Sequence, residues 1–271
     1  MEFNPKKMIY AVAEQAVALL TSKNNHRNPY ERVAPPTVRS EGYDALKWYL
    51  DCYRVSNLSG VVVLPLCGIM ELEAMNYNWY GTTLIDALIA KAQTLDDVRA
   101  IVIKTDSPGG NANAWRSLAN TIYASKKPVV AHVVSACSAA MPVVSVCDEI
   151  FIEPTTTAMM GSIGSVYIHR YDNDPETVVT IIRSKEDKFK PNSFEPIDDA
   201  TRAALQAMTV LADKEMTLVI KKGRGGKVAS EVYASAKVLY MEDALRLGLA
   251  DKKGTLSDAI ARADELANVK F

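Results

Sequence analysis

The stretch "KPVVAHVVSACSAAMPVVSVCDEIFIEP", residues 127–154, predicts the fold of this chain. It opens with an apolar, β-branched run, passes through small residues around Ser138, and closes with a second apolar run. This succession is typical of a buried strand, a closely packed helix and a further buried strand. Ser135, Cys137 and Ser138 also allow a strand-to-helix elbow that presents a nucleophile. The stretch alone leaves both interpretations open.

The same alternation of strands and helices continues on both sides of this stretch. Strands are predicted over residues 60–70, 98–106, 127–136 and 148–154, and helices over 84–95, 113–126, 198–225 and, as a helix–turn–helix pair, 240–267. Alternating strands and helices imply right-handed crossovers and a mainly parallel sheet that is covered on both faces. The predicted fold class is therefore α/β.

The first 59 residues lack the alternating strands and helices of the rest. They are predicted to form a helical N-terminal appendage to a domain over residues 60–271. A helix extends to about residue 22, a polar linker with prolines follows, and a second helical stretch covers residues 43–55. The apolar part of the first helix, residues 8–20, is too short and too polar to span a bilayer. We expect an amphipathic surface helix there and no membrane span.

Composition excludes several classes of function. The chain has 271 residues, of which 48% are hydrophobic and 23% charged, and its formal net charge of -1 gives no reason to expect a nucleic-acid partner. The four cysteines lack metal-ligand spacing and favour reduced core thiols, which indicates a cytoplasmic location. The three histidines are scattered, so neither a metal nor another cofactor is expected.

Two glycine-containing turns and one lysine cluster are the candidate sites of chemistry. "TDSPGG", residues 105–110, follows a predicted strand, and its glycines Gly109 and Gly110 could turn free N–H groups towards an oxyanion. A plain tight turn explains the same residues. "MMGSIGS", residues 159–165, is weaker alone, and the lysine-rich residues 183–196 are by default a solvated loop. His169 is the only histidine placed to act as a base.

Taken in order, these segments resemble the signal peptide peptidase A family of serine peptidases. The resemblance is closest to the soluble head-maturation proteases of tailed bacteriophages and covers roughly residues 60–265. It implies a ClpP/crotonase-like fold and makes Ser138 the nucleophile, because the family places two small residues after its serine and an acid ten positions on. Here Ala139 and Ala140 follow Ser138, and Asp148 is the acid.

The resemblance also implies a Ser–Lys dyad and an oxyanion hole formed by Gly109 and Gly110. Counting back from "NSFEP" identifies Lys188 as the base, although Lys185 stands where the family usually has a glycine. Lys190 and Lys185 therefore stay open as alternatives. A lysine can accept a proton only where burial favours its neutral form.

The implied function is that of a serine endopeptidase that acts through an acyl-enzyme, with phage capsid or scaffold precursors as substrates. A homo-oligomer is expected, located in the host cytoplasm or in a procapsid. Two alternatives remain: a crotonase-like acyl-CoA enzyme, which uses the oxyanion loop without a nucleophilic serine, and a non-catalytic relative that acts in assembly.

Overall fold

The computed structural model describes residues 44–55, 58, 60–73, 80–171 and 179–270. The predicted first helix and linker of the appendage lie outside these residues. The helices are α2 (Ala45–Cys52), α3 (Thr82–Gln93), α4 (Arg116–Tyr123), α5 (Ala140–Ser145), α6 (Asp199–Arg224), α7 (Glu231–Ala234), α8 (Met241–Arg246) and α9 (Leu256–Lys270). The helices predicted over residues 84–95, 113–126 and 198–225 correspond to α3, α4 and α6.

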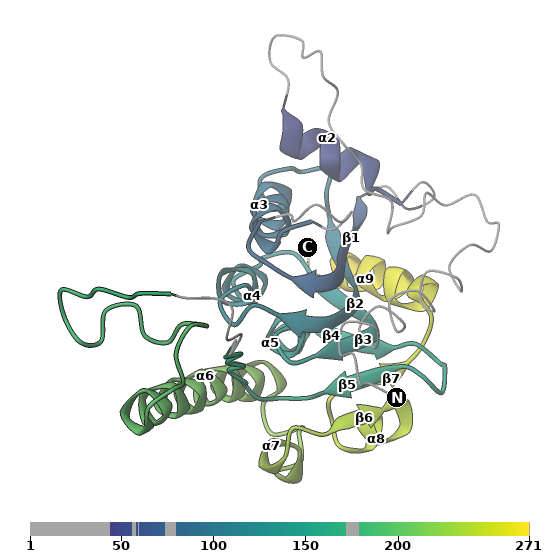
Figure 1. Cartoon of the computed structure of the whole chain (residues 1–271). Coiled ribbons are helices and arrows are strands. Elements are labelled where there is room, and N and C mark those ends of the chain that lie inside the picture. The colour runs from purple at the N-terminus through teal and green to yellow at the C-terminus, as the bar shows by residue number, and fades with distance from the viewer. Residues whose placement is uncertain (1–43, 56–57, 59, 74–79, 172–178, 271) are drawn as a thin grey trace.

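A seven-stranded, mainly parallel sheet forms the centre of the molecule (Figure 1). Its strands are β1 (Val61–Met70), β2 (Ala100–Gly110), β3 (Val129–Cys137), β4 (Glu149–Ile152), β5 (Met159–Gly161), β6 (Val238–Tyr240) and β7 (Lys252–Lys253). The main order is β1-β2-β3-β4-β7, and β5 pairs with both β3 and β6. Among the named strands of the described residues, only the β5–β6 pair is antiparallel. The predicted α/β arrangement, a mainly parallel sheet flanked by helices, is confirmed.

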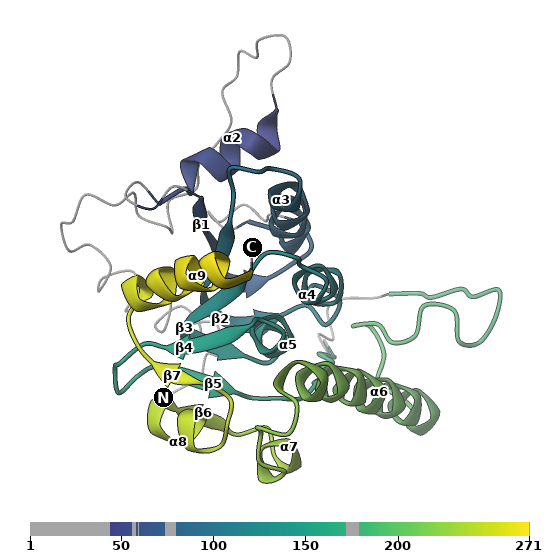
Figure 2. The ribbon, with the colours of Figure 1, turned by 180° about the vertical axis from the view of Figure 1, so that it is seen from behind.

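Both faces of the sheet are covered, as the apolar strands require. Figure 2 shows α9 on one side of the sheet and α3, α4 and α5 on the other. The α9 side packs small residues of that helix, among them Ala259 and Ala263, against Val102 and Val130. The opposite side holds the larger core, in which α5 is fully buried. The helix that follows Ser138 therefore lies at the centre of the protein.

Part of the predicted appendage packs on this body. Leu50 of α2 is fully buried, and Tyr53 joins the same core. The chain after α2 also bonds to β1: the N–H of Val63 donates to the carbonyl of Tyr53 at 2.9 Å, and that of Val55 to Val61 at 3.0 Å. These contacts fix α2 beside the first strand, while the boundary near residue 60 stays a prediction.

The structure differs from the sequence prediction mainly in short strands. β2 continues through Gly110 instead of ending before the glycine turn, because a bulge between Cys67 and Ile69 lets β1 pair with it that far. The "MMGSIGS" turn begins with β5, which adds to the edge of β3. Strands of two or three residues carry no measurable periodicity, so apolar patterning could not predict β5, β6 or β7.

Candidate active site

Ser138 lies where β3 ends and α5 is about to begin. Its φ is 51°, a left-handed conformation that few residues other than glycine adopt. Two backbone hydrogen bonds hold it there: its N–H donates to the carbonyl of Gly161 at 2.9 Å, and its carbonyl accepts from the N–H of Met141 at 2.9 Å. A strained residue fixed from both sides at a strand-to-helix elbow is a feature that clusters at active sites.

The elbow presents one hydroxyl from an otherwise buried segment. Within residues 136–147 every residue is buried except Ser138, which is partly exposed. Its Oγ lies 3.5 Å from the carbonyl oxygen of Gly164, a long contact that leaves the hydroxyl able to turn elsewhere. The small neighbours Ala139 and Ala140 are buried at 1% and 0% exposure, so nothing bulky stands beside this hydroxyl on its own segment.

Of the two glycines at the end of β2, Gly109 lies against Ser138 and Gly110 against Met70. Gly109 has a φ of 94°, and a Cβ on it would lie 2.8 Å from the Cβ of Ser138 and 2.9 Å from the nitrogen of Ala139. A Cβ on Gly110 would lie 2.3 Å from the carbonyl oxygen of Met70. Neither position has room for a side chain, and the backbone of Gly109 therefore touches the candidate nucleophile directly.

The N–H groups around Ser138 differ in availability. The N–H of Gly109 donates to the Oγ of Ser107 at 3.1 Å, and that hydroxyl donates to the carbonyl of Gly68 at 2.6 Å. The N–H of Ala139 makes no hydrogen bond with any residue that the structure describes. Sequence reasoning did not single out Ala139, although the first N–H groups of a helix are without partners by geometry and this one directly follows the serine.

The neighbouring Ser135 and Cys137 are packing residues. Ser135 Oγ donates to the carbonyl of Ser107 at 3.4 Å, across the β2–β3 pair. Cys137 is 6% exposed, and burial raises the pKa of its thiol to about 11. A thiol with so high a pKa carries almost no thiolate at neutral pH, and thiolate is the reactive form. Ser138 is therefore the better nucleophile of the three.

Lys188 lies on a segment that we call the arm, residues 179–198. Figure 1 shows the arm as a green loop that projects away from the sheet on the side of α4 and α6. Lys188 is exposed, and its carbonyl accepts from Arg183 Nε at 2.8 Å. No hydrogen bond or ion pair among the described residues joins it to Ser138. The structure of the single chain thus brings Ser138 and Gly109 together, places Gly110 against Met70 of β1, and leaves Lys188 apart.

The two alternative lysines lie on the same arm. Lys185 is exposed and supplies only its carbonyl, to the N–H of Lys188 at 3.1 Å. Lys190 Nζ donates to Asp198 at 2.8 Å, and this hydrogen bond raises the pKa of Lys190. A raised pKa holds the proton on the amine, which makes Lys190 a poorer base than a lysine without such a partner.

Exposed apolar side chains surround Lys188 on the arm. Ile182 is 93% exposed, Phe189 58% and Phe194 47%. The loop keeps its shape through an ion pair between Arg183 and Glu195, so these side chains are presented by an ordered segment. Large apolar groups gathered on an ordered projection are typical of a surface that another surface covers.

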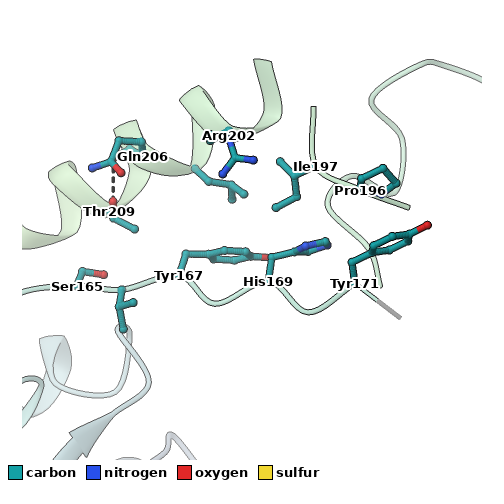
Figure 3. Close-up of a pocket in the computed structure, with 11 residues that line it drawn as sticks. Ser165, Tyr167, His169, Tyr171, Pro196, Ile197, Arg202, Gln206 and Thr209 are labelled. Carbon is teal, nitrogen blue, oxygen red and sulfur yellow. Dashed lines mark hydrogen bonds between the residues drawn. The ribbon is translucent and has the colours of Figure 1, made fainter. Parts of the chain in front are cut away.

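His169, the rival base, points elsewhere. Its Nε2 lies 2.6 Å from the carbonyl oxygen of Asn192. Figure 3 shows its ring directed from the segment after Gly164 towards Ile197 and α6. Because a carbonyl oxygen can only accept, Nε2 carries a hydrogen and cannot take one from a serine. The structure does not bring His169 to Ser138.

Comparisons with known proteins identify the family to which this chain is similar. The family model described as peptidase family S49 matches residues 121–270. The head-tail preconnector protein GP5 of Enterobacteria phage P21 is 31% identical over 221 residues, which cover 77% of this chain and 43% of that protein. The putative protease MJ0651 of Methanocaldococcus jannaschii is 29% identical over 181 residues, covering 64% and 58%.

The chain spans about half the length of these curated relatives. Among solved structures, it is similar to the 1510-N membrane-bound stomatin-specific protease in complex with a substrate peptide, at 22% identity and a TM-score of 0.49, covering 76% of this chain and 80% of that one. In the part of the chain that the structure describes, no helix combines the length and apolarity needed to cross a bilayer.

Proposed function

Because the chain belongs to peptidase family S49, we propose that it is a serine endopeptidase with Ser138 as nucleophile and Lys188 as base. Ser138 Oγ attacks the carbonyl carbon of a peptide bond while the lysine amine takes the hydroxyl proton. The lysine then returns this proton to the leaving amine as the C–N bond breaks. Water, activated by the same lysine, hydrolyses the acyl-enzyme and frees Ser138.

The observation that carries this proposal is the exposure of Ser138 alone within a buried segment, in a left-handed conformation at the end of β3. A serine placed there for packing would need neither access to solvent nor a strained backbone. Contact with the backbone of Gly109 adds the second component, a narrow site in which a carbonyl oxygen would lie among N–H groups.

The oxyanion would be held by N–H groups on both sides of Ser138. The free N–H of Ala139 serves on one side. On the other side, the predicted donors are Gly109 and Gly110, and Gly109 must exchange its bond to Ser107 for one to the substrate. Exchanging a neutral hydroxyl for an oxyanion is favourable, because charge-assisted hydrogen bonds are the stronger kind.

Lys188 would reach a serine when the arm docks on a second copy of the chain. The arm projects outward from its own body, and it carries the exposed side chains of Ile182, Phe189 and Phe194 beside the lysine. Docking would bury these groups and remove water from the amine, which favours the neutral form that a base requires. The proposed Ser–Lys dyad therefore requires the homo-oligomer that the sequence predicts.

We propose capsid or scaffold precursors of a phage as the substrates. The support is the likeness to a phage protein named a head-tail preconnector. The corresponding place of action is the host cytoplasm or the procapsid.

Labelling with a fluorophosphonate tests the nucleophile. We expect one adduct per chain by intact mass, mapped to Ser138 by peptide sequencing, absent in Ser138→Ala and present in Ser135→Ala as the matched control. The same proteins are then incubated with capsid and scaffold precursors. An unlabelled wild-type chain that cleaves nothing, although sedimentation shows the oligomer, would contradict the proposal and favour a non-catalytic role in assembly.

A further inference from the structure

A pocket of about 570 Å³ lies between residues 165–171 and one face of α6 (Figure 3). Its first lining residue is Ser165, which directly follows Gly164, the residue whose carbonyl oxygen is 3.5 Å from Ser138 Oγ. The volume lies in the range of pockets that take a specific ligand. An extended chain of substrate that leaves Ser138 on this side would therefore enter the pocket.

The two walls of the pocket come from different elements. On one wall, Tyr167, His169 and Tyr171 point to the same side of an extended segment, because alternate residues of such a segment share a face. The other wall is one face of α6, which presents Arg202 and Gln206 at helical spacing. Aromatic rings thus lie opposite a guanidinium group.

Among the described residues, Arg202 is the only lysine or arginine that lines the pocket. It is exposed and forms no ion pair within the described part of the chain. The acids of the neighbouring turn are already engaged: Asp198 accepts from Lys190 and from the N–H of Thr201 at 2.7 Å, and Glu195 accepts from Arg183. Asp199 is exposed and does not line the pocket.

Resting on the peptidase function proposed above, we propose that this pocket is a distal specificity subsite for an acidic side chain of the substrate. Arg202 binds the carboxylate, and Tyr167 and Tyr171 cover the apolar stem or an apolar neighbour. Charge complementarity favours this occupant, because a guanidinium without an ion partner binds carboxylates with two parallel hydrogen bonds. The link from Ser138 through Gly164 to Ser165, at one end of the pocket, places it within reach of a bound peptide.

The position that Arg202 recognises follows from the reach of an extended chain. Each residue advances about 3.3 Å, so His169, five residues beyond Gly164, lies within about 17 Å of Gly164, whose carbonyl oxygen contacts Ser138 Oγ. Arg202 lies across the pocket from Tyr167 and His169 (Figure 3). The acidic residue is therefore expected about three to six positions from the cleaved bond, on one side of it.

Quenched fluorescent peptides test the subsite. A set of cleavable peptides is made, each with one Glu at a different position from three to six residues on either side of the scissile bond. Each peptide is compared with one that has Gln in place of that Glu. In the wild-type chain we expect kcat/KM to favour Glu over Gln about five- to twentyfold at one position. In Arg202→Gln this ratio falls to about one, whereas Arg170→Gln, an exposed arginine outside the pocket, retains it.

The outcomes separate this inference from the proposed function. A wild-type enzyme that cleaves the peptides without preferring Glu at any position overturns the subsite and leaves the peptidase standing. A preference that survives in Arg202→Gln does the same. If Arg202→Gln changes the sedimentation of the protein, the pocket belongs to a contact between copies and the inference is wrong. Absence of both cleavage and fluorophosphonate labelling removes the peptidase, and the subsite with it.

Discussion

The elbow at Ser138 and the arm that carries Lys188 differ in burial and in the contacts that hold them in place. Every other residue of the segment 136–147 is buried, and backbone contacts from β2 and from Gly161 fix Ser138. The arm is exposed, and its hydrogen bonds run mainly within itself. One half of the proposed site is therefore complete in a single chain, and the other half depends on what the arm contacts.

Removing the proposed base, Lys188, should have the largest effect on activity. Lys188→Ala should lower kcat by about a thousandfold or more, and Ser138→Ala combined with it should cost little further, because the two residues act as one unit. Lys185→Ala and Lys190→Ala are the matched controls on the same arm and should change kcat far less. A thousandfold loss in either control, with Lys188→Ala active, would move the base to that lysine.

At the elbow, the substitution Gly109→Ala should lower kcat/KM about a hundredfold. The new methyl group would stand 2.8 Å from Ser138 Cβ, so the serine and the oxyanion donors must separate. Gly226→Ala is the control, since a Cβ there meets nothing within 4 Å. Full activity of a folded Gly109→Ala protein would show that the glycine loop is only a turn.

The two halves are joined by α6, whose C-terminal end is anchored by a buried ion pair. Arg224 is 3% exposed and donates to Asp251 at 2.8 and 2.9 Å. Burial alone would raise the pKa of Asp251, but hydrogen bonds from Arg224 and Lys227 lower it to about 2. Asp251→Asn should therefore reduce the free energy of unfolding by about 3 kcal/mol in urea titrations.

The pH dependence of this pair has a defined sign. The folded pKa of Asp251, about 2, is below the unfolded value of 3.8, so the stabilisation is fully present above pH 4. It is lost as the pH falls from about 4 to about 2, and it amounts to about 2 kcal/mol. Asp251→Asn should lack this loss, whereas Asp243→Asn, in an exposed pair with Arg246, should behave as the wild type. If the free energy of unfolding of Asp251→Asn and of the wild type depended on pH in the same way, Asp251 would not be the group responsible for the loss.

The smallest expected effect concerns Cys137, which adjoins the nucleophile. With its thiol pKa raised to about 11, iodoacetamide at pH 7.5 should leave Cys137 unmodified and activity within about twofold of the untreated enzyme. Cys52, which is partly exposed, serves as the internal control for alkylation. Alkylation of Cys137 with loss of activity would mean that the elbow opens, or that the thiol is reactive.

The two regions also show what could be predicted from the sequence. The apolar runs of β1 to β4 predicted the parallel sheet, and adjacent parallel strands end at one edge. For this reason Gly109, at the end of β2, could be expected beside Ser138, at the end of β3. Local pattern and tertiary contact agree there, because burial on both faces leaves the chain few alternatives.

The arm could not be predicted in the same way. Residues 183–196 mix lysines, acids and aromatic residues without periodicity, and such a segment takes its position from what it packs against. Phe189 and Phe194 stay exposed in the single chain, and the docking proposed above would cover them with a second copy. The N–H of Ala139, which has no hydrogen-bond partner among the described residues, was missed for a different reason. The type of a residue does not tell whether its backbone N–H is bonded.

Subunit mixing tests most directly whether the elbow of one copy and the arm of another form one site. Chains with Ser138→Ala and chains with Lys188→Ala, carrying different tags, are co-expressed, and the mixed oligomers are purified through both tags. Each variant alone should be inactive. In a random one-to-one mixture about one site in four combines an intact serine with an intact lysine from its neighbour, so the account predicts about a quarter of wild-type activity. Mixed oligomers that sediment like the wild type yet cleave nothing would contradict it, and would show that no copy supplies its lysine to another.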